Sequence, residues 1–146
     1  MSDLLVINGP NLNLLGTREP EIYGHESLSD IEDNLSNLAK ENYLTIKMMQ
    51  SNAEHEIIDC IQKAKIEETK FIIINPGPLT HTSIALRDAF LSTGIPFIEI
   101  HISNIFKREE FRKKSYLSDI SYGVIAGLGT NGYNYALMQA KKFIKE

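Results

Sequence analysis

Short apolar runs alternate along this chain with longer stretches in which apolar side chains recur every three or four residues. The short runs predict strands at residues 4–8, 44–49, 71–75, 97–102 and 123–126. The longer stretches carry the apolar stripe of an amphipathic helix, at residues 28–39, 57–64, 83–92 and 133–144. Residues 4–8 are apolar almost throughout, which is typical of a strand that is covered on both faces.

Polar side chains and one glycine mark the ends of the predicted helices. Ser27 and Asp30 have the spacing of a capping box, and Ser51 and Glu54 repeat that spacing before the next helix. Gly94 follows the third helix and can adopt the left-handed conformation with which many helices end. The sequence therefore predicts two helix starts and one helix end.

The order of these elements predicts an α/β fold. Strands that alternate with helices form a parallel sheet through right-handed crossovers, with helices on both faces. Five strands in a chain of 146 residues favour a flavodoxin-like three-layer sandwich with the strand order 2-1-3-4-5. Because no repeat or linker divides the pattern, we expect residues 1–146 to form a single catalytic domain.

Composition narrows the class of protein. The hydrophobic fraction of 42% is ordinary for a globular protein, and no apolar run approaches the ~18 to 20 residues that span a bilayer. The first residues lack the basic region and cleavage site of a signal peptide. Cys60 is the only cysteine, so an internal disulfide is impossible, which suits a reducing compartment. We expect a cytoplasmic protein that does not associate with membranes.

The charge distribution argues against a nucleic-acid partner. The net charge is −4, and the densest group of basic residues, at 107–114, is interrupted by Glu109 and Glu110. A nucleic-acid-binding protein is expected to show a continuous basic surface. A solvated helix or loop face explains this group of charges as a whole.

Polar residues follow four of the predicted strands. The carboxyl ends of parallel strands meet at one edge of a sheet, where ligands of such folds bind. Any one of these residues, taken alone, is explained as a helix cap or a turn. Their convergence favours a pocket for a small molecule that is rich in hydroxyl or carboxylate oxygens. The segments are 8–13 (NGPNLN), 50–52 (QSN), 75–83 (NPGPLTHTS) and 101–104 (HISN).

The connection from Gly9 to Glu26 is much longer than the ~2 to 6 residues usual between a strand and a helix. Long connections of this kind often close over active sites, and Gly16 and Gly24 are candidate hinges. The segment carries Arg18 and Tyr23. A surface loop without function is the alternative.

Three of these residues suggest acid–base chemistry. A phenol is a poor base at neutral pH unless a nearby cation favours its phenolate form, so Arg18 would activate Tyr23. His101 is a suitable proton donor, and strand periodicity places Glu99 on the same face, where it would support the charged imidazole. A base and an acid beside an oxygen-rich pocket suit proton abstraction next to a carbonyl, followed by loss of water.

Two other patterns do not predict sites. Residues 127–132 fit G-x-G-x-x-G between a strand and a helix, but too few residues follow for the rest of a dinucleotide site, so we expect a tight turn. The histidines at 25, 55, 81 and 101 lack the spacing of metal ligands, and no second cysteine is available. We therefore expect no metal site.

Motifs along the whole chain resemble those of the type II 3-dehydroquinate dehydratases. None of them is decisive alone, but their order and spacing together are highly specific. The chain departs from the family pattern at Ala53, at Pro78-Leu79 and at Phe106-Lys107, which bears on the rim of the pocket. The matching motifs are 8–16 (NGPNLNLLG), 18–20 (REP), 23–24 (YG), 50–52 (QSN), 74–77 (INPG), 80–83 (THTS), 85–88 (ALRD), 99–104 (EIHISN), 108–112 (REEFR), 115–116 (SY) and 123–127 (GVIAG).

The resemblance implies dehydration of 3-dehydroquinate to 3-dehydroshikimate in the shikimate pathway, which leads to chorismate and the aromatic amino acids. It implies an anti elimination through an enolate or enol, without metal or organic cofactor. The catalytic residues would be Tyr23 as base, Arg18 as stabiliser of the transition state, Asn11 for the enolate, His101 as acid and Glu99 as its orienting partner. The substrate would be bound by Asn75, His81, Ile102, Ser103, Arg112 and Arg108, the last of these closing over the site.

The resemblance also implies a homododecamer built from trimers, in which Asp88 reaches the site of a neighbouring subunit. Two other readings of the chain are a flavodoxin-like binding or signalling module and a family member that has lost catalysis. The first lacks support because Asn8 and Asn75 stand where a receiver domain has acidic residues. The second would require loss of Tyr23, Arg18 or His101, and all three are present.

Overall fold

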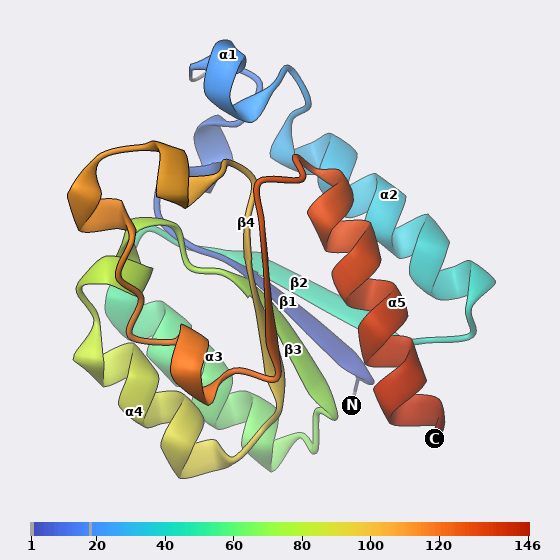
Figure 1. The fold of residues 1–146 in the computed structure, drawn as a ribbon. Helices are drawn as coiled ribbons and strands as arrows, with labels where there is room; N and C mark the ends of the chain where they lie inside the picture. The colour runs from blue at the N-terminus through green and yellow to red at the C-terminus, as the bar shows by residue number, and fades with distance from the viewer. Residues whose placement is uncertain (1, 18) are drawn as a thin grey trace.

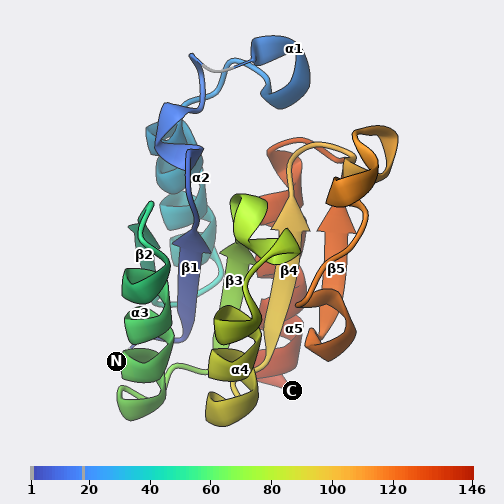
Figure 2. The same cartoon turned by 90° about the vertical axis from the view of Figure 1, so that its left-hand side faces the viewer.

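Five parallel strands form one sheet, in the order β2-β1-β3-β4-β5, in the computed structural model, which describes residues 2–17 and 19–146. This arrangement confirms the predicted α/β class and strand order. Viewed from the side, the strands point toward the end of the molecule where the segment after β1 lies (Figure 2). The strands are β1 (Leu4–Asn8), β2 (Ile46–Gln50), β3 (Phe71–Asn75), β4 (Phe97–His101) and β5 (Gly123–Ala126).

Helices cover both faces of the sheet. The pair α2 and α5 packs on one face and the pair α3 and α4 on the other, while the short helix α1 stands above the carboxyl ends of the strands (Figure 1). Short 3-10 turns follow β1, β3 and β4. The helices are α1 (Pro20–Tyr23), α2 (Leu28–Glu41), α3 (Glu54–Ile66), α4 (Ile84–Thr93) and α5 (Asn131–Lys145), and the turns are η1 (Leu12–Leu14), η2 (Gly77–His81), η3 (Ile105–Lys107), η4 (Glu110–Arg112) and η5 (Ser118–Ile120).

The core consists of two apolar layers, one on each side of the sheet. Side chains alternate between the faces of a strand, so Leu4 and Val6 pack toward α2 and α5, whereas Leu5 and Ile7 pack toward α3 and α4. All residues of β1, β3 and β4 are buried. This burial of both faces explains the continuous apolar runs in the sequence and fixes the ends of these strands rigidly.

The ends of the elements test the sequence predictions in detail. Ser27 and Asp30 form the predicted capping box of α2, and Gly94 ends α4 with a φ of 68°. The second capping box is wrong, because the Ser51 hydroxyl instead accepts a bond from the Ala53 amide and donates one to Glu56. Ser51 lies two residues before the N-cap position of α3, which Ala53 occupies.

Other boundaries differ by one or two residues. The second strand begins at Ile46 rather than at residue 44, because the Leu44 amide donates to the carbonyl of Ala39 and closes the end of α2. The expected tight turn from β5 into α5 comprises residues 127–130, with positive φ angles at Gly127 and Gly129, and residues 131–132 already belong to α5. Within the part of the chain that the structure describes, no helix has the length and hydropathy to cross a bilayer.

Candidate active site

A cavity of about 170 Å³ lies at the carboxyl edge of the sheet, where the sequence predicted a pocket. Most of the predicted site residues line it, although they come from η1, α1 and the ends of β3 and β4. The lining residues are Pro10, Asn11, Leu12, Tyr23, Asn75, Gly77, Pro78, His81, His101, Ile102, Ser103, Ile105, Arg108 and Arg112.

The floor of the cavity is built where β1 and β3 end side by side. Asn8 and Asn75 are partners in the register of these strands. The loops beyond them approach so closely that a side chain at Gly9 would meet the carbonyl oxygen of Pro76 at 2.4 Å. Only glycine fits at this position, and the close approach brings Asn11 and Asn75 to the same cavity.

A buried chain of hydrogen bonds fixes the amide of Asn75. The backbone amide of Gly77 donates to Asn75 Oδ1 at 3.2 Å, which requires Asn75 Nδ2 to be the donor to the Tyr133 hydroxyl, 3.0 Å away. Tyr133 in turn donates to Asn8 Oδ1. Tyr133 is fully buried, which raises the pKa of its phenol, so it remains a neutral donor. Because the order of donors starts at a backbone N–H, the amide has one orientation.

His101, the last residue of β4, lines the cavity, and Glu99 stands two residues before it on the same strand. His101 Nε2 lies 2.5 Å from Glu99 Oε2, and the Glu99 side chain is fully buried behind the imidazole. Glu99 therefore does not reach the cavity and acts through His101. With Nε2 engaged, Nδ1 is the ring nitrogen left to exchange a proton with a ligand.

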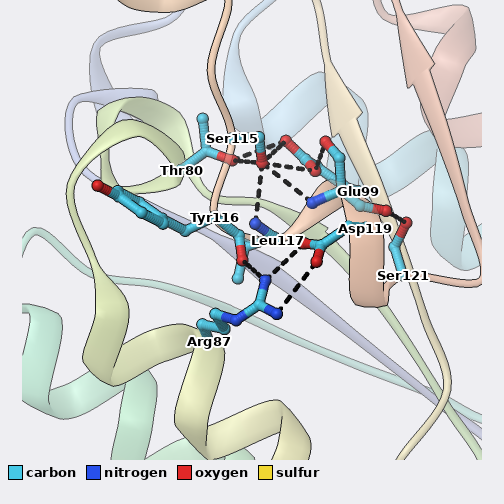
Figure 3. Close-up of polar contacts among 9 residues, drawn as sticks. Thr80, Arg87, Glu99, Ser115, Tyr116, Leu117, Asp119 and Ser121 are labelled. Carbon is cyan, nitrogen blue, oxygen red and sulfur yellow. Dashed lines mark hydrogen bonds and ion pairs between the residues drawn. The ribbon is translucent and has the colours of Figure 1, made fainter.

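Three hydroxyl groups contact the Glu99 carboxylate. Two of them, those of Thr80 and Ser115, are labelled beside Glu99 in Figure 3. Thr80 donates to Oε2 at 2.7 Å, Ser118 donates to Oε1 at 2.6 Å, and Ser115 lies 3.0 Å from both oxygens. Burial alone would raise the pKa of Glu99, but the bonds from His101, Ser118 and Thr80 outweigh it and hold the pKa below its usual range. Glu99 is therefore an ionised carboxylate in the interior.

A second histidine lies beside the first. The rings of His81 and His101 are stacked with their centroids 6.5 Å apart. His81 Nδ1 donates to the carbonyl oxygen of Lys114 at 2.7 Å. Burial, together with the nearby His101 and Arg112, lowers the pKa of His81 despite that bond. At neutral pH His81 is therefore uncharged, and its Nε2 is an acceptor for a ligand hydroxyl.

Tyr23, the last residue of α1, also lines the cavity. Arg108 Nη1 donates to the Tyr23 hydroxyl at 2.8 Å, and its guanidinium carbon lies 5.4 Å from the centre of the tyrosine ring. Arg108 also approaches Ser103 Oγ at 3.4 Å. The sequence had predicted Arg18 as the cation beside Tyr23. Arg18 lies outside the described residues, and Arg108 is a cation that the structure places beside Tyr23.

The other predicted residues occupy different places. Asn11 lines the cavity and has a φ of 72°, a left-handed conformation that asparagine tolerates. Its backbone N–H donates to Asn52 Oδ1. Arg112 lines the cavity and donates to Glu109 at 3.0 Å. Asp88 is exposed on α4 and is not among the residues that line the cavity of its own chain.

Several residues of the site were missed by sequence reasoning. Thr80, Ser115 and Ser118 contact Glu99, and Tyr133 contacts Asn75. Thr80 and Ser115 stand in motifs that carry the family resemblance, which was a usable signal. Ser118 carried no signal beyond the pattern of a loop, and Tyr133 carried none beyond the apolar stripe of a helix.

Comparison with known proteins agrees with this geometry. A model of the family described as Dehydroquinase class II matches residues 2–141. A 3-dehydroquinate dehydratase of Francisella tularensis subsp. novicida (strain U112) is 60% identical over 142 residues, which cover 97% of this chain and 96% of that protein.

Solved structures give the same result. The type II dehydroquinase from Butyrivibrio crossotus DSM 2876 has a TM-score of 0.92 at 45% identity, over 94% of this chain and 95% of that one. The enzyme of the same type from Propionibacterium acnes has a TM-score of 0.92 at 41% identity, over 97% of this chain and 98% of that one.

The parallel sheet, together with a polar pocket that joins a tyrosine to a histidine–glutamate pair, defines an α/β enzyme. The chain belongs to the class II dehydroquinase family, whose type II 3-dehydroquinate dehydratases are hydro-lyases. The family predicted from the sequence motifs is thus confirmed.

Proposed function

We propose that this chain dehydrates 3-dehydroquinate to 3-dehydroshikimate by an anti elimination through an enolate or enol, as a step of the shikimate pathway. One observation carries the proposal. Tyr23 and His101 line the same cavity from different elements, so a base and an acid are available on separate sides of one ligand. An anti elimination requires this separation, because the proton and the hydroxyl leave from opposite faces.

Tyr23 is the proposed base. The guanidinium of Arg108 donates to its oxygen and stabilises the phenolate that proton abstraction requires. The phenolate removes a proton from the carbon next to the ketone, and the electron pair moves to the ketone oxygen. Asn11 lies at the same cavity and would stabilise the resulting enolate. Arg18 keeps the role implied by the family resemblance, as stabiliser of the transition state.

His101 is the proposed acid. The enolate collapses, the bond to the departing hydroxyl breaks, and Nδ1 of the imidazolium supplies the proton that makes it water. The Glu99 carboxylate, held 2.5 Å from Nε2, favours the charged ring before this step. Base and acid end the turnover in the opposite protonation states, so a proton exchange with solvent resets the site.

The remaining residues suit a polyhydroxy acid. Asn75 has one free amide hydrogen after its bond to Tyr133, and neutral His81 offers an acceptor. Arg112, Ser103 and the backbone at Ile102 supply donors for a carboxylate. The proposed chemistry uses protein groups alone, without a metal or organic cofactor.

The proposed assembly is a homododecamer of trimers in the cytoplasm. The exposed position of Asp88, outside its own cavity, is compatible with a role in a neighbouring site. Light scattering of the purified protein tests the mass of the assembly. Loss of turnover in Asp88→Asn, with restoration when it is mixed with a Tyr23→Phe chain, would establish a contribution across subunits.

Ultraviolet absorbance of the purified protein mixed with 3-dehydroquinate tests the reaction. We expect the enone absorbance of 3-dehydroshikimate to grow in the presence of chelator and of borohydride, which traps Schiff bases. Absence of this signal in folded, assembled protein would remove the dehydratase function and leave a binding or scaffold role.

A further inference from the structure

The interior behind His101 contains hydroxyl groups to which the proposed reaction gives no role. Thr80 is fully buried, and its hydroxyl and that of Ser118 donate to different oxygens of Glu99. Ser115 lies within 3.0 Å of both oxygens and 2.7 Å from the Thr80 hydroxyl. With His101, these groups fill the acceptor sites of the carboxylate.

The direction of these bonds follows from the backbone. Ser115 Oγ accepts from the amides of Leu117 and Ser118, at 3.0 and 3.1 Å. With both lone pairs used, the single Ser115 proton must be donated toward the Glu99 and Thr80 oxygens. The arrangement therefore suits an ionised carboxylate, which only accepts hydrogen bonds. A protonated carboxyl group would have to donate a hydrogen bond among groups that are themselves donors.

A separate set of contacts anchors the segment that carries the two serines (Figure 3). Arg87 on α4 donates to the carbonyl of Tyr116 at 2.9 Å and to both carboxylate oxygens of Asp119. The Tyr116 amide donates to the carbonyl oxygen of Thr80 at 2.8 Å. These contacts tie residues 115–121 to α4 and η2, so the hydroxyls are held in place before any ligand arrives.

Other charged and titratable groups surround the Glu99–His101 pair. His81 on η2 stacks beside His101, and Arg112 and Arg108 face the same cavity from the segment after β4. Arg87 and Asp119 form an ion pair behind the serine segment. The two arginines bring positive charge to the cavity, and Glu99 is the carboxylate in contact with His101.

We propose that Thr80, Ser115 and Ser118 are positioning residues for the dehydration: their hydroxyls keep Glu99 ionised, so that the proton shared by Glu99 and His101 stays on the imidazole. There it can reach the departing hydroxyl of the substrate. A carboxylate buried without such donors favours its protonated form, and Glu99 would then take the proton from His101. This inference rests on the proposed function, since it assigns His101 the role of acid.

Thr80→Val and Ser118→Ala test the proposal, because each removes one hydroxyl at small change of volume. Thr80→Ser restores the hydroxyl. Ser121→Ala is the matched control, since Ser121 donates to the carbonyl of Ser118 and not to Glu99. Circular dichroism melting of each variant verifies folding, and Thr80→Val with Thr80→Ser keeps the test available if Ser118→Ala does not fold.

The first readout is the pH profile of kcat/KM for 3-dehydroquinate. When the Glu99–His101 pair has lost its proton, no imidazolium balances the charge of the carboxylate, so this state depends most on the hydroxyl donors. Removal of a donor should therefore shift the alkaline limb of the profile to higher pH, by about 0.5 to 1 pH unit. We expect kcat to fall about tenfold, because part of the protonated pair holds its proton on Glu99. Thr80→Ser and Ser121→Ala should match the wild type. A purely structural defect would lower the rate without moving the limb.

The second readout needs no turnover. The imidazole ¹⁵N shifts of His101 in the ligand-free protein report whether the ring is charged. The wild type should show an imidazolium below the alkaline limb, and the double variant Thr80→Val/Ser118→Ala should show a larger neutral fraction. An active wild type whose limb and ¹⁵N titration do not change in these variants overturns this inference alone. An inactive wild type overturns the proposed function and, with it, the role in dehydration.

Discussion

The two sides of the cavity are built in opposite ways. On the acid side, Glu99 is fully buried and His101 is 6% exposed, and every oxygen of the carboxylate has donors. On the base side, the segment from Gly16 to Glu26 carries Tyr23 on a helix of four residues, and its described residues are half-buried or exposed. Figure 1 shows α1 standing away from the layers of the fold.

This difference corresponds to two physical demands. A buried charge must have its partners in place at all times, because removing them in the interior costs several kcal/mol. A ligand must enter and leave, and a segment with little buried surface opens at a small free-energy cost. The proposed acid therefore stands on a rigid strand, and the proposed base stands on a more exposed segment, which suits closure over a ligand.

The largest effect is expected for Tyr23→Phe, which removes the proposed base and should leave the fold intact. We predict that turnover falls about 10³-fold or more, because no other group replaces the phenolate. The melting temperature should change by less than ~2 °C, since Tyr23 is only half-buried. Absorbance assays and calorimetry measure both quantities. A variant that keeps turnover would remove Tyr23 from its role.

On the acid side, Glu99→Gln should damage both catalysis and stability. The glutamine nitrogen cannot accept the bonds that the carboxylate receives, so we expect a loss of about 2 to 3 kcal/mol in the free energy of unfolding. Turnover should fall about 10²-fold, because a neutral amide supports the imidazolium less. Urea unfolding and steady-state kinetics provide the measurements. A fall in turnover with unchanged stability would contradict the contrast between the two sides.

The same variant should change the response to acid. The pKa of Glu99 is lowered in the folded protein, so its ionised form stabilises the fold above the unfolded value of about 4.3. That contribution is lost as the pH falls through the lower folded pKa. In Glu99→Gln the decrease in unfolding free energy between pH 6 and pH 3 should therefore be smaller than in the wild type. Asp3 and Asp119, whose pKa values are also lowered, keep part of the slope.

Tyr133→Phe extends the comparison to the floor of the cavity, with an intermediate effect. Loss of the hydroxyl leaves Asn8 Oδ1 and Asn75 Nδ2 without these partners in the interior. We expect a loss of about 1 to 3 kcal/mol in stability. Since only the bond from the Gly77 amide then holds the Asn75 side chain, KM should rise about tenfold with a smaller change in kcat. Tyr135→Phe, on the exposed part of the same helix, is the control.

The sequence was sufficient for the parts of this site that depend on strand periodicity. Asn8, Asn75 and His101 each end a buried strand, and parallel strands bring such ends to one edge. The alternation of side chains along β4 also placed Glu99 on the same face as His101. These relations depend on local backbone geometry, which residue patterns record directly.

Long-range contacts were not predictable in this way. Ser118 reaches Glu99 because Arg87 anchors a loop without regular pattern, and Tyr133 reaches Asn8 across 125 positions of the chain. The contact between Arg108 and Tyr23 could not be predicted from spacing either, since the two residues are 85 positions apart. The wrong prediction of a capping box at Ser51 has a local origin, because the Ser51 hydroxyl accepts from the Ala53 amide in the turn before the helix.

The smallest effect is expected at a surface contact between the segment that carries Tyr23 and the rest of the fold. Thr130 at the start of α5 donates to Glu26 Oε1 at 2.8 Å, on the surface. Thr130→Val removes this bond, while Thr130→Ser retains it. An exposed hydrogen bond contributes at most about 1 kcal/mol, so we expect stability to change little. Turnover should nevertheless change two- to threefold, because the bond biases the position of the segment that carries Tyr23.

Limited proteolysis distinguishes this effect from a general loosening. If the bond restrains only the base side, Thr130→Val should be cleaved faster within residues 16–26, and substrate should protect the segment in both proteins. Cleavage elsewhere should keep its wild-type rate, since the sheet and the Glu99 surroundings do not depend on this contact. Faster cleavage throughout the chain would mean that the segment with Tyr23 and the surroundings of Glu99 open together. The contrast between a rigid acid side and a movable base side would then be wrong.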